Sequence, residues 1–297
     1  MITSMSQLLT VFKDELLKYK RTSLAKVDTS IKRGVFAPAD RPPMIALMPQ
    51  YEICDPPYSG GQYKVRRKIN VEVWVSLLNA KEAMKETMEL FEEVKEIAQK
   101  SDYLNNQVLD IVYSTEQGTF GLSTPPDVKF MQRSVLPLTF VTKEKLPTDR
   151  KEWMTPNLRE GKASTLTTVI YNALSNYRDA NPDKVQRLTD YASPPQAVNR
   201  ELTLVPVEEN LDHDWAGVDG VHRTYKIWYM TKLFGAEKSL DDNLAVVEEI
   251  KDAIFSNLQW DGYCINSWIP RVDFLQDTEE LRYVTEMSLE TLGKENL

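Results

Sequence analysis

The chain has 297 residues, of which 42% are hydrophobic and 27% charged, a composition typical of a soluble globular protein with about two domains. Its net charge of −8 opposes a large phosphate-neutralising surface of the kind that drives non-specific DNA binding, so we expect nucleic acid not to be a direct partner and expect no specific nucleic acid binding. No apolar run approaches the ~20 residues of a membrane helix, and charges interrupt the N-terminus where a signal peptide is apolar, so we expect a soluble cytoplasmic chain without a membrane partner.

The first segment reads as an amphipathic helix that leads through a long loop to a strand. Met5, Leu8 and Phe12 recur at helical spacing after Ser4, which can act as an N-cap. A polar loop of about twenty residues follows, which is longer than most loops inside compact domains. It ends at a Pro-Pro pair and the strand "MIALMPQYE", where Pro49 predicts a bulge or an unpaired edge.

The next segments predict a hairpin, a helix and two further strands. The loop "ICDPPYSGGQ" at residues 53–62 contains two adjacent glycines, which favour a hairpin turn. Val71, Val73 and Val75 then alternate as in a half-buried strand. Residues 107–114 and 130–143 read as the last two strands. Between the valines and these strands lies a helix whose apolar face we assign to Met84, Met88, Phe91, Val94 and Ala98.

This order of elements recurs in the second half of the chain. Residues 67–95 align without a gap on residues 223–251, which places Arg67 on Arg223 at an offset of 156. In the second copy, a helix with Ser164 as its predicted N-cap precedes the strand "ELTLVPVEE", where Pro206 stands as Pro49 does. Strands at residues 264–274 and 280–294 complete the copy. Its middle helix has an apolar face of Leu240, Leu244, Val247, Ile250 and Ile254.

The repeat predicts an α+β fold with two tandem copies of an α-β-β-α-β-β module. Each copy would form a small, mainly antiparallel sheet flanked by helices. We place the first module at residues 1–145 and the second at residues 164–297. Residues 146–163 contain two prolines among charged residues, so they read as a linker.

The loops between the first two strands of each copy are candidate interface loops. They carry Pro56, Pro57, Tyr58, Asp212, His213 and Trp215. Two interpretations remain open: an aromatic ring packed on its own hairpin, or a projecting hairpin that contacts another subunit. His213 and His222, with the aspartates around them, lack the spacing of a metal site, so we expect no bound metal.

Residues that could carry catalysis form no recognisable motif. Cys54 and Cys264 occupy unmatched positions in the two halves and read as isolated reduced thiols. The sequence contains no glycine-rich nucleotide loop and no serine-hydrolase motif. The pair Glu92-Glu93, which recurs as Glu248-Glu249, diverges by about 100° around a helix and reads as a solvated face. We therefore expect no enzyme activity and no cofactor.

Lys64, Arg66 and Lys68 form a candidate basic contact patch. On a strand these side chains share one face, opposite the face that bears Arg67. The second copy does not repeat the patch. Contact with DNA or phosphate is one interpretation, and an ion-pairing protein interface is the one we prefer.

The module resembles the tail terminator and tail-completion proteins of long-tailed bacteriophages. The resemblance rests on the opening helix, the loop to "PPMIAL", the proline within "LMPQYE" and "LVPVEE", and the strand "KINVEVWV" followed directly by the helix "AKEAMKETMELFEEVKEIAQ". The late strand "SVLPLTFVTK" completes the match. The resemblance covers nearly the whole chain, and it rests on the order of the elements and on their residue patterns. The chain differs from the family in its duplication, because the family proteins have one module per subunit.

This resemblance implies a structural virion protein of the tail or neck, assembled in the host cytoplasm. Such a protein forms a homo-oligomeric ring that caps the head-proximal end of the tail tube and joins it to the neck. The implied partners are further copies of the chain, the tail tube protein, head-completion or neck proteins, and possibly the tail sheath. With two modules per chain, we favour a ring of six chains over a pseudo-sixfold ring of three.

Two alternatives belong to other function classes. The chain could be a tandem α+β adaptor outside any virion that binds a protein or peptide at its free sheet edges. It could also be an enzyme whose carboxylates cannot be paired from the sequence. A symmetric ring would favour the terminator, and a deep pocket shared by carboxylates would favour the enzyme.

Overall fold

The chain forms two compact units, each with an α+β fold. The computed structural model describes residues 2–25, 27, 31–34, 42–55, 62–100, 104, 106–113, 120–123, 130–145, 162–190, 199–212, 220–232, 236–256, 260, 263–264, 266–277 and 282–294. One unit holds Met1–Glu52, Lys64–Glu144 and Phe234–Asp241, and the other holds Ile53–Tyr63, Lys145–Leu233 and Asp242–Leu297. We call them the N-terminal and the C-terminal unit, assign each helix or strand to the unit that holds most of its residues, and describe each unit by itself.

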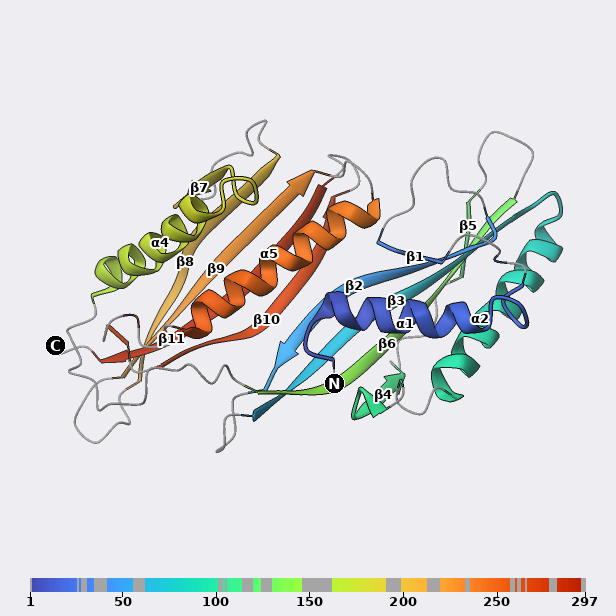
Figure 1. The fold of residues 1–297 in the computed structure, drawn as a ribbon, viewed down its shortest axis with the longest axis horizontal. Helices are drawn as coiled ribbons and strands as arrows, with labels where there is room; N and C mark the ends of the chain where they lie inside the picture. The colour runs from blue at the N-terminus through green and yellow to red at the C-terminus, as the bar shows by residue number, and fades with distance from the viewer. Residues whose placement is uncertain are drawn as a thin grey trace. The chain divides into compact units, whose positions relative to one another are not determined.

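The N-terminal unit places two helices on one face of a mixed sheet. Its elements are α1 (Met5–Lys18), β1 (Ile31–Arg33), β2 (Met44–Cys54), β3 (Gln62–Leu77), α2 (Ala80–Lys100), β4 (Asp110–Tyr113), β5 (Phe120–Ser123) and β6 (Phe130–Lys145). The strand order runs β4-β6-β3-β2, with β1 parallel to β2 and β5 antiparallel to β6. Figure 1 shows α1 in front of these strands and α2 beside them.

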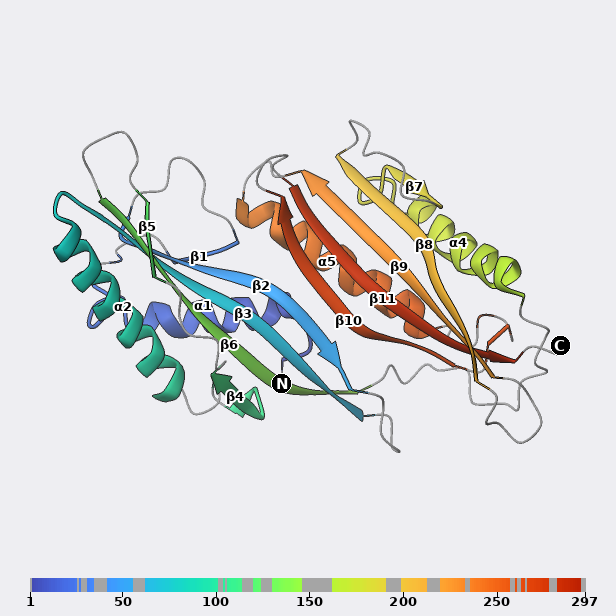
Figure 2. The same cartoon turned by 180° about the vertical axis from the view of Figure 1, so that it is seen from behind.

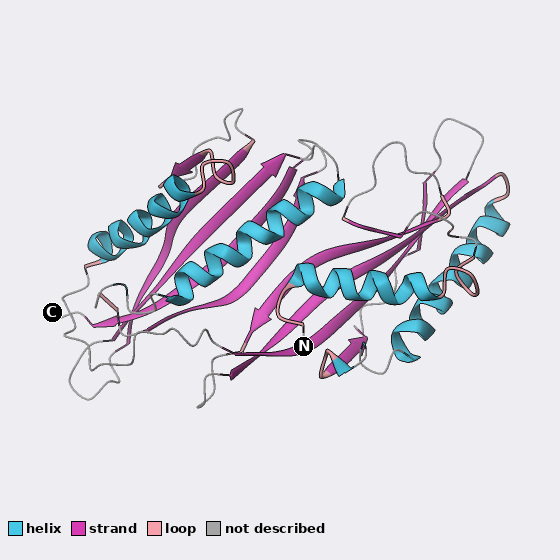
Figure 3. Cartoon of the chain, in the orientation of Figure 1, coloured by secondary structure: helices cyan, strands magenta, loops and turns pink. Residues whose placement is uncertain are grey.

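The C-terminal unit repeats this arrangement. Its elements are α4 (Ala163–Ala180), β7 (Arg187–Thr189), β8 (Arg200–Asp212), β9 (Gly220–Lys232), α5 (Ala236–Ser256), β10 (Asn266–Asp277) and β11 (Arg282–Lys294). The strand order runs β10-β11-β9-β8-β7, and β7 is parallel to β8. Figures 1 and 3 look onto the helices, and Figure 2 looks onto the opposite sheet face, where the strands of each unit lie in front.

Several elements of the two units begin at the same offset. Strands β1 and β7 begin at Ile31 and Arg187, which are 156 residues apart, and the same interval separates the starts of β2 and β8, of α2 and α5, and of β4 and β10. The strand register agrees as well, because Ile31 pairs with Ile45 and Arg187 pairs with Glu201. The shift of 14 residues between paired positions is therefore the same in both units.

The structure confirms the α+β class and adds a short strand to each predicted loop. Strands β1 and β7 lie within the long loops that follow the opening helices, and each pairs parallel to the next strand. A strand of three residues, such as "IKR", is too short to show the alternation of apolar and polar residues by which a strand is recognised in a sequence. Strand β5 was likewise not predicted.

The two predicted helix caps have different outcomes. The Ser4 hydroxyl accepts a hydrogen bond from the Gln7 amide at 3.1 Å, which confirms Ser4 as the N-cap of α1. The prediction for Ser164 is wrong, because α4 begins one residue earlier, at Ala163, and its N-cap is Lys162. Lys162 makes no side-chain capping bond.

The predicted apolar face of α2 is partly wrong. Met84 and Met88 are 48% and 46% exposed, although their counterparts Leu240 and Leu244 in α5 are both 1% exposed. Helix α2 buries a neighbouring stripe of Ala83, Thr87, Leu90, Val94, Ile97 and Ala98. Both stripes have helical spacing, so packing against the sheet decides which stripe is buried.

The prolines of the two long strands have different environments. The pairing of β8 with β9 shifts register between Pro206 and Glu208, so the predicted bulge is present there. Pro206 is exposed, and the pairing of β7 with β8 covers only Glu201–Thr203. Pro49 is instead buried within β2.

Candidate functional site

A buried arginine holds together three strands of the N-terminal unit. Arg67 on β3 is fully buried, and its Nε donates to Glu52 Oε1 on β2 at 2.6 Å. On β6 it donates to the Thr142 hydroxyl at 2.5 Å and to Glu144. Burial alone would lower the pKa of Arg67, but the negative charges of Glu52 and Glu144 outweigh it and raise this pKa. The guanidinium therefore stays charged and links β2, β3 and β6.

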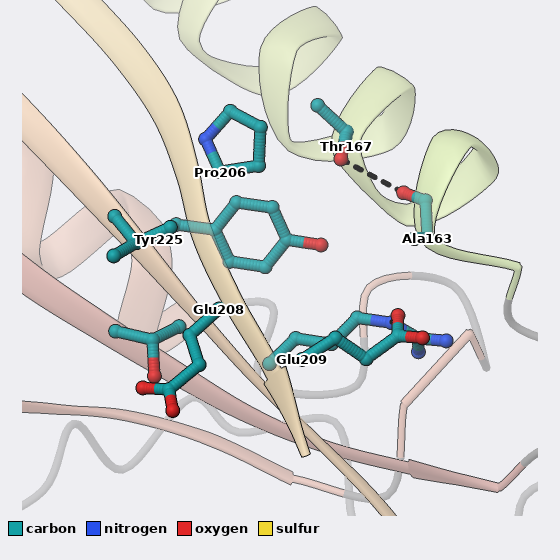
Figure 4. Close-up of a pocket in the computed structure, with 9 residues that line it drawn as sticks. Ala163, Thr167, Pro206, Glu208, Glu209 and Tyr225 are labelled. Atoms are coloured by element: carbon teal, nitrogen blue, oxygen red, sulfur yellow. Dashed lines mark hydrogen bonds and ion pairs between the residues drawn. The ribbon is translucent and has the colours of Figure 1, made fainter. Parts of the chain in front are cut away.

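The equivalent arginine of the C-terminal unit lines a pocket. Arg223 on β9 is 2% exposed, and its Nε donates to Glu209 Oε2 on β8 at 2.6 Å. The pocket has a volume of about 230 Å³ and lies between the start of α4 and the bulged part of β8. In Figure 4 the hydroxyl of Tyr225 points towards α4. The lining residues are Ala163, Thr167, Pro206, Val207, Glu208, Glu209, Arg223, Thr224 and Tyr225.

A glycine distinguishes the two arginine sites. Val141 of β6 pairs with Asp110 of β4, and Leu292 of β11 pairs with Asn266 of β10, 156 residues after Asp110, so Thr142 and Gly293 occupy equivalent positions. Thr142 accepts a hydrogen bond from Arg67 through its hydroxyl, whereas Gly293 has no side chain. A Cβ atom at Gly293 would lie 3.3 Å from Arg223 Nη1. The glycine therefore leaves room for the Arg223 side chain.

Two titratable groups at or near this pocket, Tyr225 and Cys264, have raised pKa values. Burial raises the pKa of Tyr225, and the Thr167 hydroxyl and the charge of Arg223 reduce that shift. Burial also raises the pKa of the Cys264 thiol to about 12, against which the nearby Arg223 acts only weakly. Both groups are protonated at neutral pH, so neither supplies a nucleophile or a general base.

The cysteines give a direct test of these environments. We expect Cys54 and Cys264 of the native protein to react with a thiol reagent such as Ellman's reagent at pH 8 far more slowly than a free cysteine, because both are buried and the pKa of Cys264 is raised. In guanidinium chloride both thiols should react at once. Rapid labelling of Cys264 under native conditions, identified by mass spectrometry, would contradict the environment described here.

The predicted interface loops lie mostly outside the described residues. Pro56, Pro57 and Tyr58 are outside them, as are His213 and Trp215. The backbone of Asp212 ends β8, where it pairs with Gly220 of β9. The two interpretations of these loops therefore stay predictions.

The predicted basic patch lies on the sheet face opposite the helices. Lys64 and Arg66 are exposed and Lys68 is 9% exposed, and all three alternate on β3 with the buried Val65 and Arg67. Lys68 Nζ lies 5.6 Å from the centre of the Tyr51 ring on β2, within range of a cation–π contact.

Strand β6 adds a fourth cation to this patch. Thr142 and Glu144 both turn towards Arg67, so Lys143 between them points to the other face, where it is exposed. Because β6 is hydrogen-bonded to β3, Lys143 lies on the same sheet face as the three cations of β3. We call Lys64, Arg66, Lys68 and Lys143 the basic face.

The repeated glutamate pairs differ in their surroundings. Glu92 is 60% exposed, as a solvated face requires. Glu249 instead accepts hydrogen bonds from the Tyr177 hydroxyl at 2.7 Å and from Lys184 Nζ at 2.6 Å. Burial would raise the pKa of Glu249, but these two partners lower it overall. Glu249 therefore links α5 to the end of α4, while its side chain stays 39% exposed.

No metal cluster and no membrane helix occur within the described part of the chain. These residues contain no group of three or more histidine, cysteine, aspartate or glutamate side chains that could hold a metal ion. None of the helices among them is both long and apolar enough to cross a membrane.

Sequence reasoning missed the buried arginine sites. The repeat contained a signal for them, since Arg67 aligns with Arg223 and an acidic residue follows each strand proline by three positions, as Glu52 and Glu209 do. An arginine opposite a glutamate at matched places in two copies indicates an ion pair across neighbouring strands. The Gly293 substitution had no such signal.

Comparisons with known proteins leave the family of this chain open. No protein-family model and no curated protein matches it. Among solved structures, the chain is similar to one from the "Virion of native gene transfer agent (GTA) particle". That match has a TM-score of 0.36 and 15% sequence identity, and it covers 44% of this chain and 96% of the other.

Proposed function

We propose that this protein is a tail terminator or tail-completion protein of the long-tailed phage type, built as a tandem duplication. The modules would span residues 1–145 and 164–297, joined by residues 146–163. The observation that carries this proposal is the offset of 156 residues between the starts of four pairs of corresponding elements, together with the shared register of β1–β2 and β7–β8. The phage resemblance rests on this element order, and its recurrence supports two copies of one module.

The proposed role is assembly rather than catalysis. Two observations support it: the charged side chains buried beneath the sheets are used in ion pairs between strands, and the Cys264 thiol is protonated at neutral pH. In a ring, each subunit offers one patch to a complementary patch on its neighbour, and the ring closes when the rotation permits it. We favour six chains over three.

The proposed place of the ring is the head-proximal end of the tail tube in the virion, after assembly in the host cytoplasm. One ring face would match the last ring of the tube, and the other would meet head-completion or neck proteins. The candidate interface loops are the proposed axial contacts, and the tail sheath is a further partner if the tail contracts. A terminator must not reproduce on its outer face the surface that it binds, because polymerisation would then continue.

The oligomeric state tests this proposal. We expect the purified full chain, alone or with tube protein, to give closed rings of six chains in native mass spectrometry and negative-stain electron microscopy. Rings of three chains would correct the number and keep the function. A monomer that stays monomeric with every tail component would contradict the proposal.

A further inference from the structure

The N-terminal unit includes the first residues of helix α5, which contact α1 and β1. Phe234–Asp241 belong to this unit. The Glu237 carboxylate accepts hydrogen bonds from Lys13 Nζ on α1 at 2.6 Å and from the backbone N–H of Arg33 on β1 at 3.0 Å. The Arg33 guanidinium donates to Asp241 at 2.7 Å. Two acidic side chains of α5 are therefore bound by two basic residues of α1 and β1.

The side chains of β2 and β8 correspond at an offset of 157 residues, although the two strands begin at the offset of 156. Pro49 and Pro206 are separated by this interval. So are Glu52 and Glu209, each of which accepts a hydrogen bond from Nε of the arginine on the neighbouring strand. Because the two glutamates make the same bond, the offset of 157 relates the residues that pair with β2 to those that pair with β8.

At this offset an aspartate takes the place of Arg33. Arg33 pairs with Leu47 at the end of β1. The counterpart of Leu47 is Leu204, and both leucines are fully buried. The shift of 14 residues between β7 and β8 leads from Leu204 back to Asp190, which directly follows β7 and is exposed. Helix α4 contacts β7 as α1 contacts β1, so Asp190 borders the surface that α4 and β7 form.

Two lysines of α2 stand at the positions of the two acids of α5. The alignment of the two copies places Lys81 on Glu237 and Lys85 on Asp241. Both lysines are exposed. The Lys85 side chain is 78% exposed and lies 3.7 Å from Glu89, a surface ion pair of little strength. The charges of the helix surface and of the strand surface are therefore reversed together, which keeps the two surfaces complementary.

The start of α2 also exposes apolar side chains. Met84 and Met88 are 48% and 46% exposed, and Leu78 just before the helix is 69% exposed. The counterpart of Met84 is Leu240, which lies in the part of α5 that belongs to the N-terminal unit and is 1% exposed. Helix α2 thus leaves open to solvent an apolar position that α5 buries.

We propose that the start of α2 binds the surface of α4 and β7 on a second copy of this chain. Lys81 and Lys85 face Asp190 of that copy, and Met84 and Met88 are buried beside them. The contact repeats between two chains the contact that the start of α5 makes with α1 and β1, with the charges exchanged. It rests on the self-assembly of the proposed function, for which it supplies the contact between neighbouring chains. Because the two surfaces differ, such contacts join chains head to tail and close a ring when the rotation permits it.

The reversed charges also oppose the wrong pairing of surfaces. On α1 and β1 of another chain, Lys81 and Lys85 would meet basic residues, namely Lys13 and Arg33. Like charges brought together at an interface disfavour binding. The start of α2 therefore selects the C-terminal unit of its neighbour.

Sedimentation velocity of the full chain, alone and with tube protein, tests the apolar part of this contact. We expect Met84→Asp/Met88→Asp to weaken assembly at least about tenfold, because it removes apolar contact area and places carboxylates in the interface. Both methionines are exposed in the chain, so circular dichroism should show an unaltered fold. The matched control compares Met88→Asp with Leu275→Asp, since Leu275 on β10 is 51% exposed and lies outside the proposed contact. Leu275→Asp should assemble as the unaltered chain does.

A charge exchange tests the pairing of the two surfaces. Lys81→Glu/Lys85→Asp places acids opposite Asp190 and should weaken assembly about tenfold. Adding Asp190→Arg to this variant should restore assembly, because the contact then carries the same charges as that of α5 with β1. The control Lys95→Glu/Lys100→Asp makes the same change of charge further along α2 and should assemble normally.

The outcomes separate this contact from the proposed function. Rings that form equally well from the unaltered chain and from the Met84→Asp/Met88→Asp variant would overturn the contact and leave the proposed function standing, as would a failure of Asp190→Arg to restore assembly. Equal losses for Met88→Asp and Leu275→Asp would also overturn it. Variants that keep their rings but lose the tube protein would assign the start of α2 to the tube instead. A chain that stays monomeric alone and with tube protein would contradict both proposals.

Discussion

Replacing Arg67 with methionine is expected to lower the free energy of unfolding by about 3–5 kcal/mol. The substitution removes the cation that pairs with two buried carboxylates, since Glu52 is fully buried and the Glu144 side chain is 7% exposed. A buried carboxylate without a partner loses its hydration and gains nothing in return. Urea unfolding followed by circular dichroism measures the loss.

The equivalent change in the C-terminal unit is the matched control. Arg223→Met should cost clearly less, because the side chain of its partner Glu209 is 41% exposed and remains hydrated. The triple variant Arg67→Met/Glu52→Gln/Glu144→Gln should recover part of the stability that Arg67→Met loses. Equal costs for Arg67→Met and Arg223→Met would contradict the difference between the two arginine sites.

Truncating Leu244 and Met88 to alanine should have very different effects, although the two residues correspond in the repeat. Leu244 on α5 is 1% exposed, so Leu244→Ala should destabilise the protein by about 2–5 kcal/mol. Met88 on α2 is 46% exposed, so Met88→Ala should change stability by less than about 0.5 kcal/mol. Midpoints of urea unfolding compare the two variants. A large cost for Met88→Ala in the isolated chain would mean that α2 buries the stripe predicted from the sequence.

Periodicity was sufficient to predict the long elements of this fold. The alternating valines of β3, the apolar stripe of α5 and the final strands β6 and β11 all lie close to their predicted positions. Each of these segments spans several helical turns or several apolar-polar alternations of a strand, so one atypical residue does not obscure the period of the apolar residues. The repeat strengthened each prediction, because two copies of a pattern are less readily accidental than one.

The remaining features depend on contacts that are distant in the sequence. Strand β1 forms because Ile31–Arg33 find a partner in Ile45–Leu47, and three residues cannot indicate that pairing. The choice between the stripe of Met88 and that of Thr87 on α2 depends on the sheet beneath the helix. At the candidate sites, strand alternation correctly placed Lys64, Arg66 and Lys68 opposite Arg67, whereas Lys143 joined them only through the neighbouring strand.

The restriction of the basic face to one unit sets the stoichiometry of any complex that uses it. A chain with two similar sheets presents the three cations of β3 once, since Gly220, His222 and Thr224 stand at the matching positions of β9, so an assembly of such chains displays as many basic faces as chains and half as many as sheets. A partner that contacts these three cations would therefore bind each chain once, even though the fold is present twice.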